Sequence, residues 1–234
     1  DNEKDRKKLI VGFVVLTWNS ERFVENCFSS IIRLSVVKPV IRVVDNGSSD
    51  NTLRMLNALE SHENFKVLAQ GRNLGTTVSR NLGIRDLPDS VDYICILDSD
   101  TIINDAAISR MIRVLEADNS IGIVGPTMRS SDGTLQLSGR NLPTLGIKLR
   151  KAIPHKGISA KGSSLEIPST PIVDGIQDVP YLLSACWLMP RHVVDMVGQL
   201  DERIFYAPED VDYCVRCWKT NYRVVRCWEA EITH

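Results

Sequence analysis

Two aspartates lie one residue apart where an apolar run of the chain ends. The run Tyr93–Leu97 reads YICIL, and Asp98, Ser99 and Asp100 follow it directly. This composition predicts a buried strand, whereas carboxylates are costly to desolvate and repel one another when they are close. Two carboxylates at this spacing can hold a hard divalent cation, and the cation can bridge them to a phosphate. We therefore predict a metal-assisted phosphate site at the end of this strand.

A second acidic pair stands at the start of a predicted helix. Glu209 and Asp210 follow Pro208, a residue that suits the first turn of a helix. The apolar residues that then recur at helical spacing are Val211, Cys214, Val215 and Trp218. The positive end of the helix dipole favours ionised carboxylates, so Asp210 could act as a general base. Acidic residues also stabilise helix N-termini without any catalytic role, and both interpretations remain open.

The elements that must position these residues alternate along the chain. The runs rich in Val and Ile that predict strands are Leu9–Leu16, Val40–Val44, Phe65–Leu68, Tyr93–Leu97 and Ile121–Val124. Amphipathic patterns lie between these runs, and each predicts a helix with one buried face. The alternation predicts an α/β fold with a mainly parallel sheet that is flanked by helices on both faces. A chain of 234 residues can form this as a single large domain.

Polar loops follow the predicted strands. They read LTWNSE, VDNGSSDNT, QGRNLGTTVSRN and LDSDT. In a parallel sheet such loops meet at one edge, where ligands bind. The chain has neither a G-x-G-x-x-G after its first strand nor a G-x-x-x-x-G-K-[ST] motif, which argues against a dinucleotide fold and a P-loop. Each loop alone could be polar only because it is solvated, but four at one edge favour a nucleotide site.

Composition and charge exclude several other classes of function. Lys and Arg total 28 and Asp and Glu total 29, so the net charge of -1 gives no general attraction to nucleic acid. The longest apolar run, Leu9–Trp18, is shorter than the roughly 20 residues that span a bilayer, and the charged residues 1–8 do not resemble a signal peptide. We expect a cytoplasmic protein with reduced, buried cysteines. Cys214 and Cys217 form a C-x-x-C that lacks a partner motif for zinc.

Five segments together carry a resemblance to a known family. They are VVLTWNSERFVENCFSSI, VVDNGSSDNT, NLGTTVSRNLGI, ILDSDT and IFYAPEDVDYCVR. In this order the chain resembles the family-2 inverting glycosyltransferases of the GT-A fold, and especially their bacterial rhamnosyltransferase-type members. The resemblance implies a charged arm (1–8), a nucleotide-sugar-binding half (9–128) and an acceptor-binding and catalytic-base half of the same domain (129–234).

The resemblance also implies roles for individual residues. It assigns substrate contacts to Thr17, Asn19, Glu21, Asp45, Arg80, Asp98 and Trp187. It makes Asp100 a direct metal ligand, places Asp98 at the metal or the ribose, and offers His234 as a further ligand. Other interpretations stay open for some of these residues. Asp45 begins an ordinary Asp-Asn-Gly turn, Arg80 could form an ion pair on a helix face, and a lone histidine is often incidental.

The reaction implied by the resemblance is the inverting transfer of a sugar. Asp210 is the expected base, Glu209 holds the acceptor or neighbouring groups, and Mg²⁺ or Mn²⁺ is the cofactor. The expected donor is a UDP or dTDP sugar, and the expected acceptor is a saccharide or lipid-linked saccharide in cell-surface polysaccharide or glycoconjugate synthesis. A non-catalytic nucleotide-sugar-binding module is one alternative. A sugar-nucleotide nucleotidyltransferase is another, although LTWNSE lacks the glycine and the basic residues of its loop.

A long irregular segment at about 139–178 is unusually basic. Between Gly139 and Gly162 the chain has no acidic residue, and its basic residues are Arg140, Lys148, Arg150, Lys151, Lys156 and Lys161. Loops of this length are often functional or disordered. The segment could be a solvated lid, or it could contact an anionic acceptor or the inner membrane surface, which would make the protein peripheral to the membrane.

Overall fold

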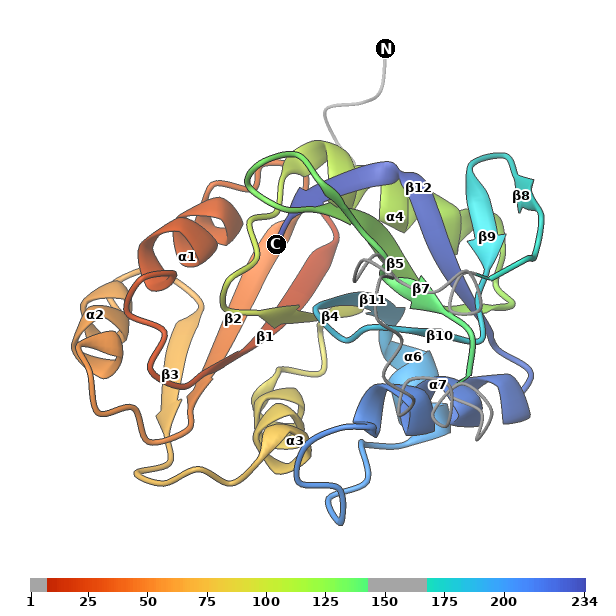
Figure 1. Cartoon of the computed structure of the whole chain (residues 1–234). Coiled ribbons are helices and arrows are strands. Elements are labelled where there is room, and N and C mark those ends of the chain that lie inside the picture. Colours follow the sequence, from red (N-terminus) through yellow and green to blue (C-terminus); the bar gives the residue numbers. More distant parts are fainter. Residues whose placement is uncertain (1–7, 143–167) are drawn as a thin grey trace, which may run out of the picture.

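One mixed β-sheet forms the centre of the computed structural model, which describes residues 8–142 and 168–234 (Figure 1). The first strands are β1 (Ile10–Thr17), β2 (Lys38–Asp45), β3 (Phe65–Ala69), β4 (Tyr93–Asp98), β5 (Ile121–Arg129), β6 (Leu135–Gln136) and β7 (Gly139–Arg140). The later strands are β8 (Ile172–Val173), β9 (Ile176–Asp178), β10 (Tyr181–Leu182), β11 (Cys186–Pro190) and β12 (Arg223–Thr233). The sheet order is β3-β2-β1-β4-β11-β5-β12-β9-β8, with β6 beside β5. Strands β7 and β10 form a small separate sheet.

The first half of the sheet is parallel, as the sequence predicts. Strand β1 pairs with β2 and β4, and β2 pairs with β3, all in parallel. In this register Thr17 lies opposite Asp45, and Leu16 lies opposite Asp98. The carboxyl ends of β1, β2 and β4 therefore meet at one edge. Strand β11 is antiparallel to both β4 and β5, while β12 runs parallel to β5. Both predicted halves of the chain thus contribute to one sheet.

Helices cover both faces of the sheet, which confirms the predicted α/β architecture (Figure 1). They are α1 (Val24–Ile32), α2 (Thr52–Leu59), α3 (Thr76–Asp86), α4 (Asp105–Ala117), α6 (Arg191–Val197) and α7 (Glu209–Lys219). One apolar core lies under α1, α2 and α4 and includes Phe28, Leu56 and Ile108. The other core lies under α3, α6 and α7 and includes Ile84 and Cys214. The burial of these apolar faces stabilises the three-layer arrangement.

Several local features of the structure bear on the site and on the sequence predictions. Asn104 caps α4, because its side chain accepts a 2.9 Å hydrogen bond from the backbone N–H of Ala107. All six cysteines are buried and unpaired, as expected. Among the described residues, no helix is long and apolar enough to cross a membrane. Arg140 is described, but the other predicted basic residues of the long segment lie in 143–167, outside the described residues, as does most of the charged arm.

Candidate active site

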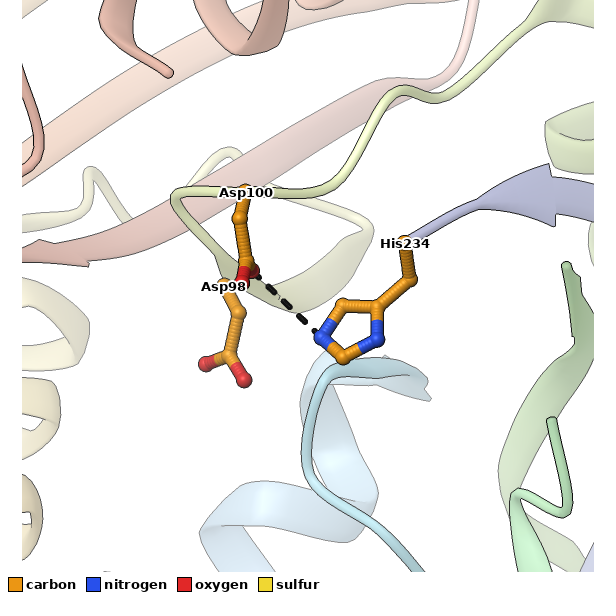
Figure 2. Close-up of side chains that lie close together, drawn as sticks. All are labelled: Asp98, Asp100 and His234. Carbon is orange, nitrogen blue, oxygen red and sulfur yellow. Dashed lines mark ion pairs between the residues drawn. The ribbon is translucent and has the colours of Figure 1, made fainter. Parts of the chain in front are cut away.

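The two aspartates near the end of β4 lie beside His234, the residue that follows β12. Ile102 and Thr233 exchange backbone hydrogen bonds of 2.9 and 3.2 Å, which bring the end of β12 to the loop that follows Asp100. One ligand atom each of Asp98, Asp100 and His234 can be chosen so that all lie within 4.8 Å of one another. Figure 2 shows the imidazole of His234 facing Asp100 beside the end of β4. Residues more than 130 positions apart thus form one cluster.

The electrostatics of this cluster couple its members. Nε2 of His234 lies 3.4 Å from Oδ1 of Asp100, and Nδ1 lies 2.9 Å from Oε1 of Gln136. The hydrogen bond with His234 lowers the pKa of Asp100, and the same contact raises the pKa of His234. Desolvation raises the pKa of Asp98, although the positive charge of Arg80 opposes this. Two carboxylate oxygens and an imidazole nitrogen fit a divalent cation such as Mn²⁺.

Arg80 connects this cluster to the helix that carries the predicted base. Its side chain, which comes from α3, is 3% exposed, and its guanidinium donates to Oδ1 of Asp98 at 2.8 Å. The same group donates to Oγ of Ser184 at 2.8 Å and to Oε1 of Glu209 at 3.3 Å. These contacts form the ion pair that was the alternative for Arg80, and they engage both terminal nitrogens of the guanidinium, whereas Nε has no partner among the described residues. The pair is buried, however, and does not lie on an exposed helix face. Contact of Arg80 with a nucleotide or diphosphate stays a prediction.

Helix α7 begins with the two predicted catalytic carboxylates. Glu209 is 6% exposed and is held by Arg80 and by the hydroxyl of Ser184 at 3.3 Å. Asp210 is half-buried and accepts a 2.8 Å hydrogen bond from the backbone N–H of Val211. Desolvation raises the pKa of Asp210, and this effect exceeds the opposing influence of the Val211 hydrogen bond and Arg80. The negative charge of Glu209 also raises the pKa of Asp210, so its carboxylate is a stronger base than that of an exposed aspartate.

The innermost residues of the predicted nucleotide pocket contact one another. Thr17 and Asp45 are both buried, and Oγ1 of Thr17 donates to Oδ1 of Asp45 at 3.0 Å. The carboxylate of Asp45 also accepts from the hydroxyl of Ser48 at 2.6 Å and from its backbone N–H at 3.0 Å. Asp45 therefore organises the turn that follows β2. Direct contact of Thr17 or Asp45 with a nucleotide stays a prediction.

The outer residues of this pocket join the loops that follow β1 and β2. Asn19 accepts a 2.8 Å hydrogen bond from the backbone N–H of Ser49, and Glu21 accepts from the side chain of Asn51 at 2.8 Å. Asn19 adopts a φ of 50°, a conformation that asparagine tolerates better than most residues. The structure thus brings the residues predicted around the nucleotide together at one edge of the sheet. Their contact with a ligand stays a prediction.

Trp187 does not fit the role expected of it. It lies on β11, is 0% exposed and stacks on Tyr213 with ring centroids 5.7 Å apart. A side chain with no exposed surface cannot touch a substrate, so the expectation of substrate contact is corrected. The reason is that β11 inserts between β4 and β5 and turns this residue into the core under α7.

Two buried polar residues that shape the site were not predicted from the sequence. Ser184 joins Arg80 to Glu209, but nothing in its surroundings YLLSACW distinguishes it from a loop serine. Asn46 is 2% exposed and accepts a 2.7 Å hydrogen bond from the hydroxyl of Ser79 on α3. Its position directly after Asp45 was a usable signal, although an Asp-Asn-Gly sequence reads equally well as a turn.

Comparison with known proteins agrees with this geometry. The sequence model described as Glycosyl transferase family 2 matches residues 13–165. The N-acetylglucosaminyl-diphospho-decaprenol L-rhamnosyltransferase of Mycobacterium tuberculosis is 25% identical over 235 residues, which cover 96% of this chain and 76% of that protein.

Solved structures share the fold at low sequence identity. S. aureus TarS 1-349 in complex with UDP has a TM-score of 0.68 and 17% identity over 97% of this chain and 60% of that one. The mannosyltransferase PcManGT from Pyrobaculum calidifontis, in complex with GDP-Man and Mn2+, has a TM-score of 0.69 and 15% identity over 98% of this chain and 57% of that one. The chain thus spans about three fifths of the length of these two structures. The shared architecture confirms the predicted GT-A-type fold.

Proposed function

Because the chain belongs to glycosyl transferase family 2, we propose that it transfers a sugar from a nucleoside diphosphate sugar to an acceptor hydroxyl and inverts the anomeric centre. The observation that carries this proposal is the cluster of Asp98, Asp100 and His234 beside the ion pair of Arg80 and Glu209. The cluster supplies a cation site, and Arg80 joins it to the helix that carries Asp210. Donor and base thus belong to one site.

A divalent cation would be held by Asp98, Asp100 and His234. When bound, such a cation neutralises the charge that develops on the departing diphosphate. The imidazole of His234 favours Mn²⁺ over Mg²⁺, because Mg²⁺ prefers ligand sets made only of oxygen. The complex of PcManGT with GDP-Man and Mn2+ supports this choice of ion. His234 must lose its proton to ligate a metal, so its raised pKa weakens cation binding at low pH.

The base chemistry would be done by Asp210. Its carboxylate takes the proton of the acceptor hydroxyl while the oxygen forms a bond to the anomeric carbon, and the bond from that carbon to the diphosphate breaks on the opposite face. Glu209 cannot easily share this role, because Arg80 and Ser184 already hold it. We assign Glu209 to positioning the start of α7. Asp210 is the member of the pair with a half-buried, accessible carboxylate.

The substrates follow from the relatives. S. aureus TarS has been solved in complex with UDP and with UDP-GlcNAc, which supports a UDP sugar as donor, with a dTDP sugar as the other expected donor. The name of the mycobacterial relative describes transfer to a saccharide on a diphospho-decaprenol carrier. We therefore infer a saccharide or lipid-linked saccharide acceptor in cell-surface glycan synthesis. A lipid-linked acceptor would place the protein at the inner face of the membrane.

The cation site gives the first test. Asp100→Ala should remove the gain in UDP affinity that Mn²⁺ provides, because the variant lacks a charged ligand that lies beside His234. Calorimetric titration of UDP with Mn²⁺ and with EDTA measures this gain. Asp89→Ala, which changes a fully exposed aspartate, is the matched control and should behave like the original protein. Equal UDP affinity with and without Mn²⁺ in the original protein would rule out the metal assignment.

The base gives a test by pH. Asp210 accepts a proton only when it is ionised, and its pKa lies above the ordinary aspartate value because of desolvation. We therefore expect kcat/KM for transfer to fall as pH decreases through this raised pKa, at a higher pH than an exposed aspartate would give. Donor concentration and Mn²⁺ must be saturating at each pH, so that cation binding does not set the profile. A rate that stays constant down to the ordinary aspartate range would contradict the assignment.

A further inference from the structure

The loop between α6 and α7, residues 198–208, is fastened to α3 along its length. The backbone N–H of Thr76 donates to the carbonyl of Phe205 at 2.7 Å, and the hydroxyl of Thr77 donates to the carbonyl of Ile204 at 2.6 Å. Further back in the loop, the side chain of Asn81 donates to the carbonyl of Leu200 at 2.9 Å and accepts from its N–H at 3.0 Å. The path of this loop is therefore fixed up to the start of the base helix.

Gly75 allows the closest part of this contact. It precedes α3 with a φ of +82°, and a Cβ at this position would lie 2.5 Å from the carbonyl oxygen of Phe205 and 2.7 Å from Cδ2 of its ring. Any other residue would push the loop away, and the positive φ would add strain. The backbone of the loop and the ring of Phe205 thus lie directly against the start of α3.

Two aromatic side chains on this fixed loop remain exposed. Phe205 is 58% exposed and Tyr206 is 73% exposed, only a few residues before Glu209 and Asp210. Neither the ring nor the hydroxyl of Tyr206 has a partner among residues 8–142 and 168–234. Exposed apolar side chains that lie next to one another mark interaction surfaces, whereas single scattered ones are ordinary. Because their backbone is anchored, a ligand that binds these two rings would have to order only their side chains and not the loop.

We propose that Phe205 and Tyr206 form the subsite that binds the saccharide ring of the acceptor, an inference that rests on the proposed function. The C–H face of a sugar ring can pack on an aromatic face, while the hydroxyl of Tyr206 can hydrogen-bond to a sugar hydroxyl. Tyr206 precedes Asp210 by four positions, so a ring bound there would lie near the start of the helix that carries the base. The loop carries Asp201 and Glu202 but one basic residue, Arg203, which pairs with Asp201, while Glu202 pairs with Arg85. The loop therefore has no excess of positive charge that would attract an anionic membrane surface, which favours a neutral saccharide as the occupant.

The experiment measures saccharide binding and donor binding separately. The full chain, loaded with UDP and Mn²⁺, is titrated with disaccharides that end in N-acetylglucosamine, glucose, galactose, mannose or rhamnose, and binding is followed by ligand-observed NMR. We expect Tyr206→Ala to weaken the best-bound disaccharide about tenfold, which corresponds to about 1.4 kcal/mol. Tyr206→Phe should lose less, because it keeps the ring. Met196→Ala, which changes a side chain that is 68% exposed on α6, should bind like the original protein.

Several results would overturn the subsite. The original protein could bind none of these disaccharides. Tyr206→Ala could bind the best disaccharide as tightly as the original protein does, or Met196→Ala could lose as much disaccharide affinity as Tyr206→Ala. The original protein could instead bind anionic phospholipid vesicles. If Tyr206→Ala abolished that binding and left disaccharide binding unchanged, the loop would be a membrane contact. UDP affinity in the presence of Mn²⁺ reports on the proposed function independently. If the original protein binds UDP with Mn²⁺ as expected, but Tyr206→Ala does not change disaccharide binding, only the subsite is wrong and the proposed function stands.

Discussion

Replacement of Asp210 by Asn is expected to lower transfer by roughly 10²- to 10⁴-fold, the usual contribution of a positioned general base. The variant keeps the shape of the side chain and its ability to accept the 2.8 Å hydrogen bond from the N–H of Val211. UDP and Mn²⁺ should therefore bind about as before, because Asp98, Asp100 and His234 are unchanged. Single-turnover kinetics at saturating donor, together with calorimetry of UDP, would separate the loss of chemistry from a loss of binding.

Asp212 provides the matched control on the same helix. Its carboxylate accepts a 2.9 Å hydrogen bond from Arg216 one turn later and is therefore engaged away from the proposed base position. Asp212→Asn should cost only a few tenths of a kcal/mol of stability, the contribution of an i,i+4 pair, and should leave the transfer rate nearly unchanged. If Asp212→Asn were the variant that lost transfer, or if Asp210→Asn kept near-normal turnover, the base would have been misassigned.

Replacement of Arg80 by Met is expected to destabilise the fold by about 3–5 kcal/mol, because it leaves the buried carboxylate of Glu209 without its cation. In a chain of this length the loss corresponds to a decrease in Tm on the order of 10 °C. Thermal unfolding near neutral pH, followed by circular dichroism, measures the change. Met fills a similar volume, so the measured loss reflects the missing charge and hydrogen bonds more than a cavity.

Arg203→Met is the control variant for the stability effect of Arg80→Met. Arg203 pairs with Asp201 at 2.6 Å, but its side chain is 90% exposed, so Arg203→Met should leave the free energy of unfolding nearly unchanged. The two variants thus separate a buried ion pair from a surface pair. A stable Arg80→Met protein that had lost UDP affinity would support the prediction, made from sequence, that Arg80 faces the diphosphate or the nucleotide.

The parallel part of the fold was predictable because short stretches of sequence define most of its strands and helices. Strands β1 and β4 are short apolar runs that end in polar residues, and α1 and α2 each have an apolar face, whereas α3 buries mainly polar side chains. Strand β11 was not predictable in the same way. Its residues CWLMP read as an apolar run, but their place between β4 and β5, antiparallel to both, depends on pairing with strands from another part of the chain. This insertion also buries Trp187 and so accounts for the incorrect expectation about it.

In the candidate site, too, some residues were recognisable from the sequence and some contacts were not. Asp98 and Asp100 were recognisable from two carboxylates that close a strand, and Glu209 and Asp210 from their position at a helix start. The buried contacts of Arg80 could not be seen, because Glu209 is 129 positions away and Ser184 is 104 positions away. The side chain of Arg80 reaches from α3 to the start of α7 and to Ser184 before β11, and this contact arises only in the folded chain. The burial that raises the pKa of Asp210 likewise arises only in the folded chain.

The contacts of helix α3 have a consequence for the coupling between donor binding and acceptor binding. On one side its Ser79 is bonded to Asn46 in the loop after β2, and on the other its Thr76, Thr77 and Asn81 hold the loop before α7. A displacement of α3 on donor binding would therefore move the acceptor side as well. Thermodynamic reciprocity then requires that the acceptor change the affinity for the donor by the same factor. Measured in either direction, that one coupling free energy would show how firmly the two halves of the site act as a unit.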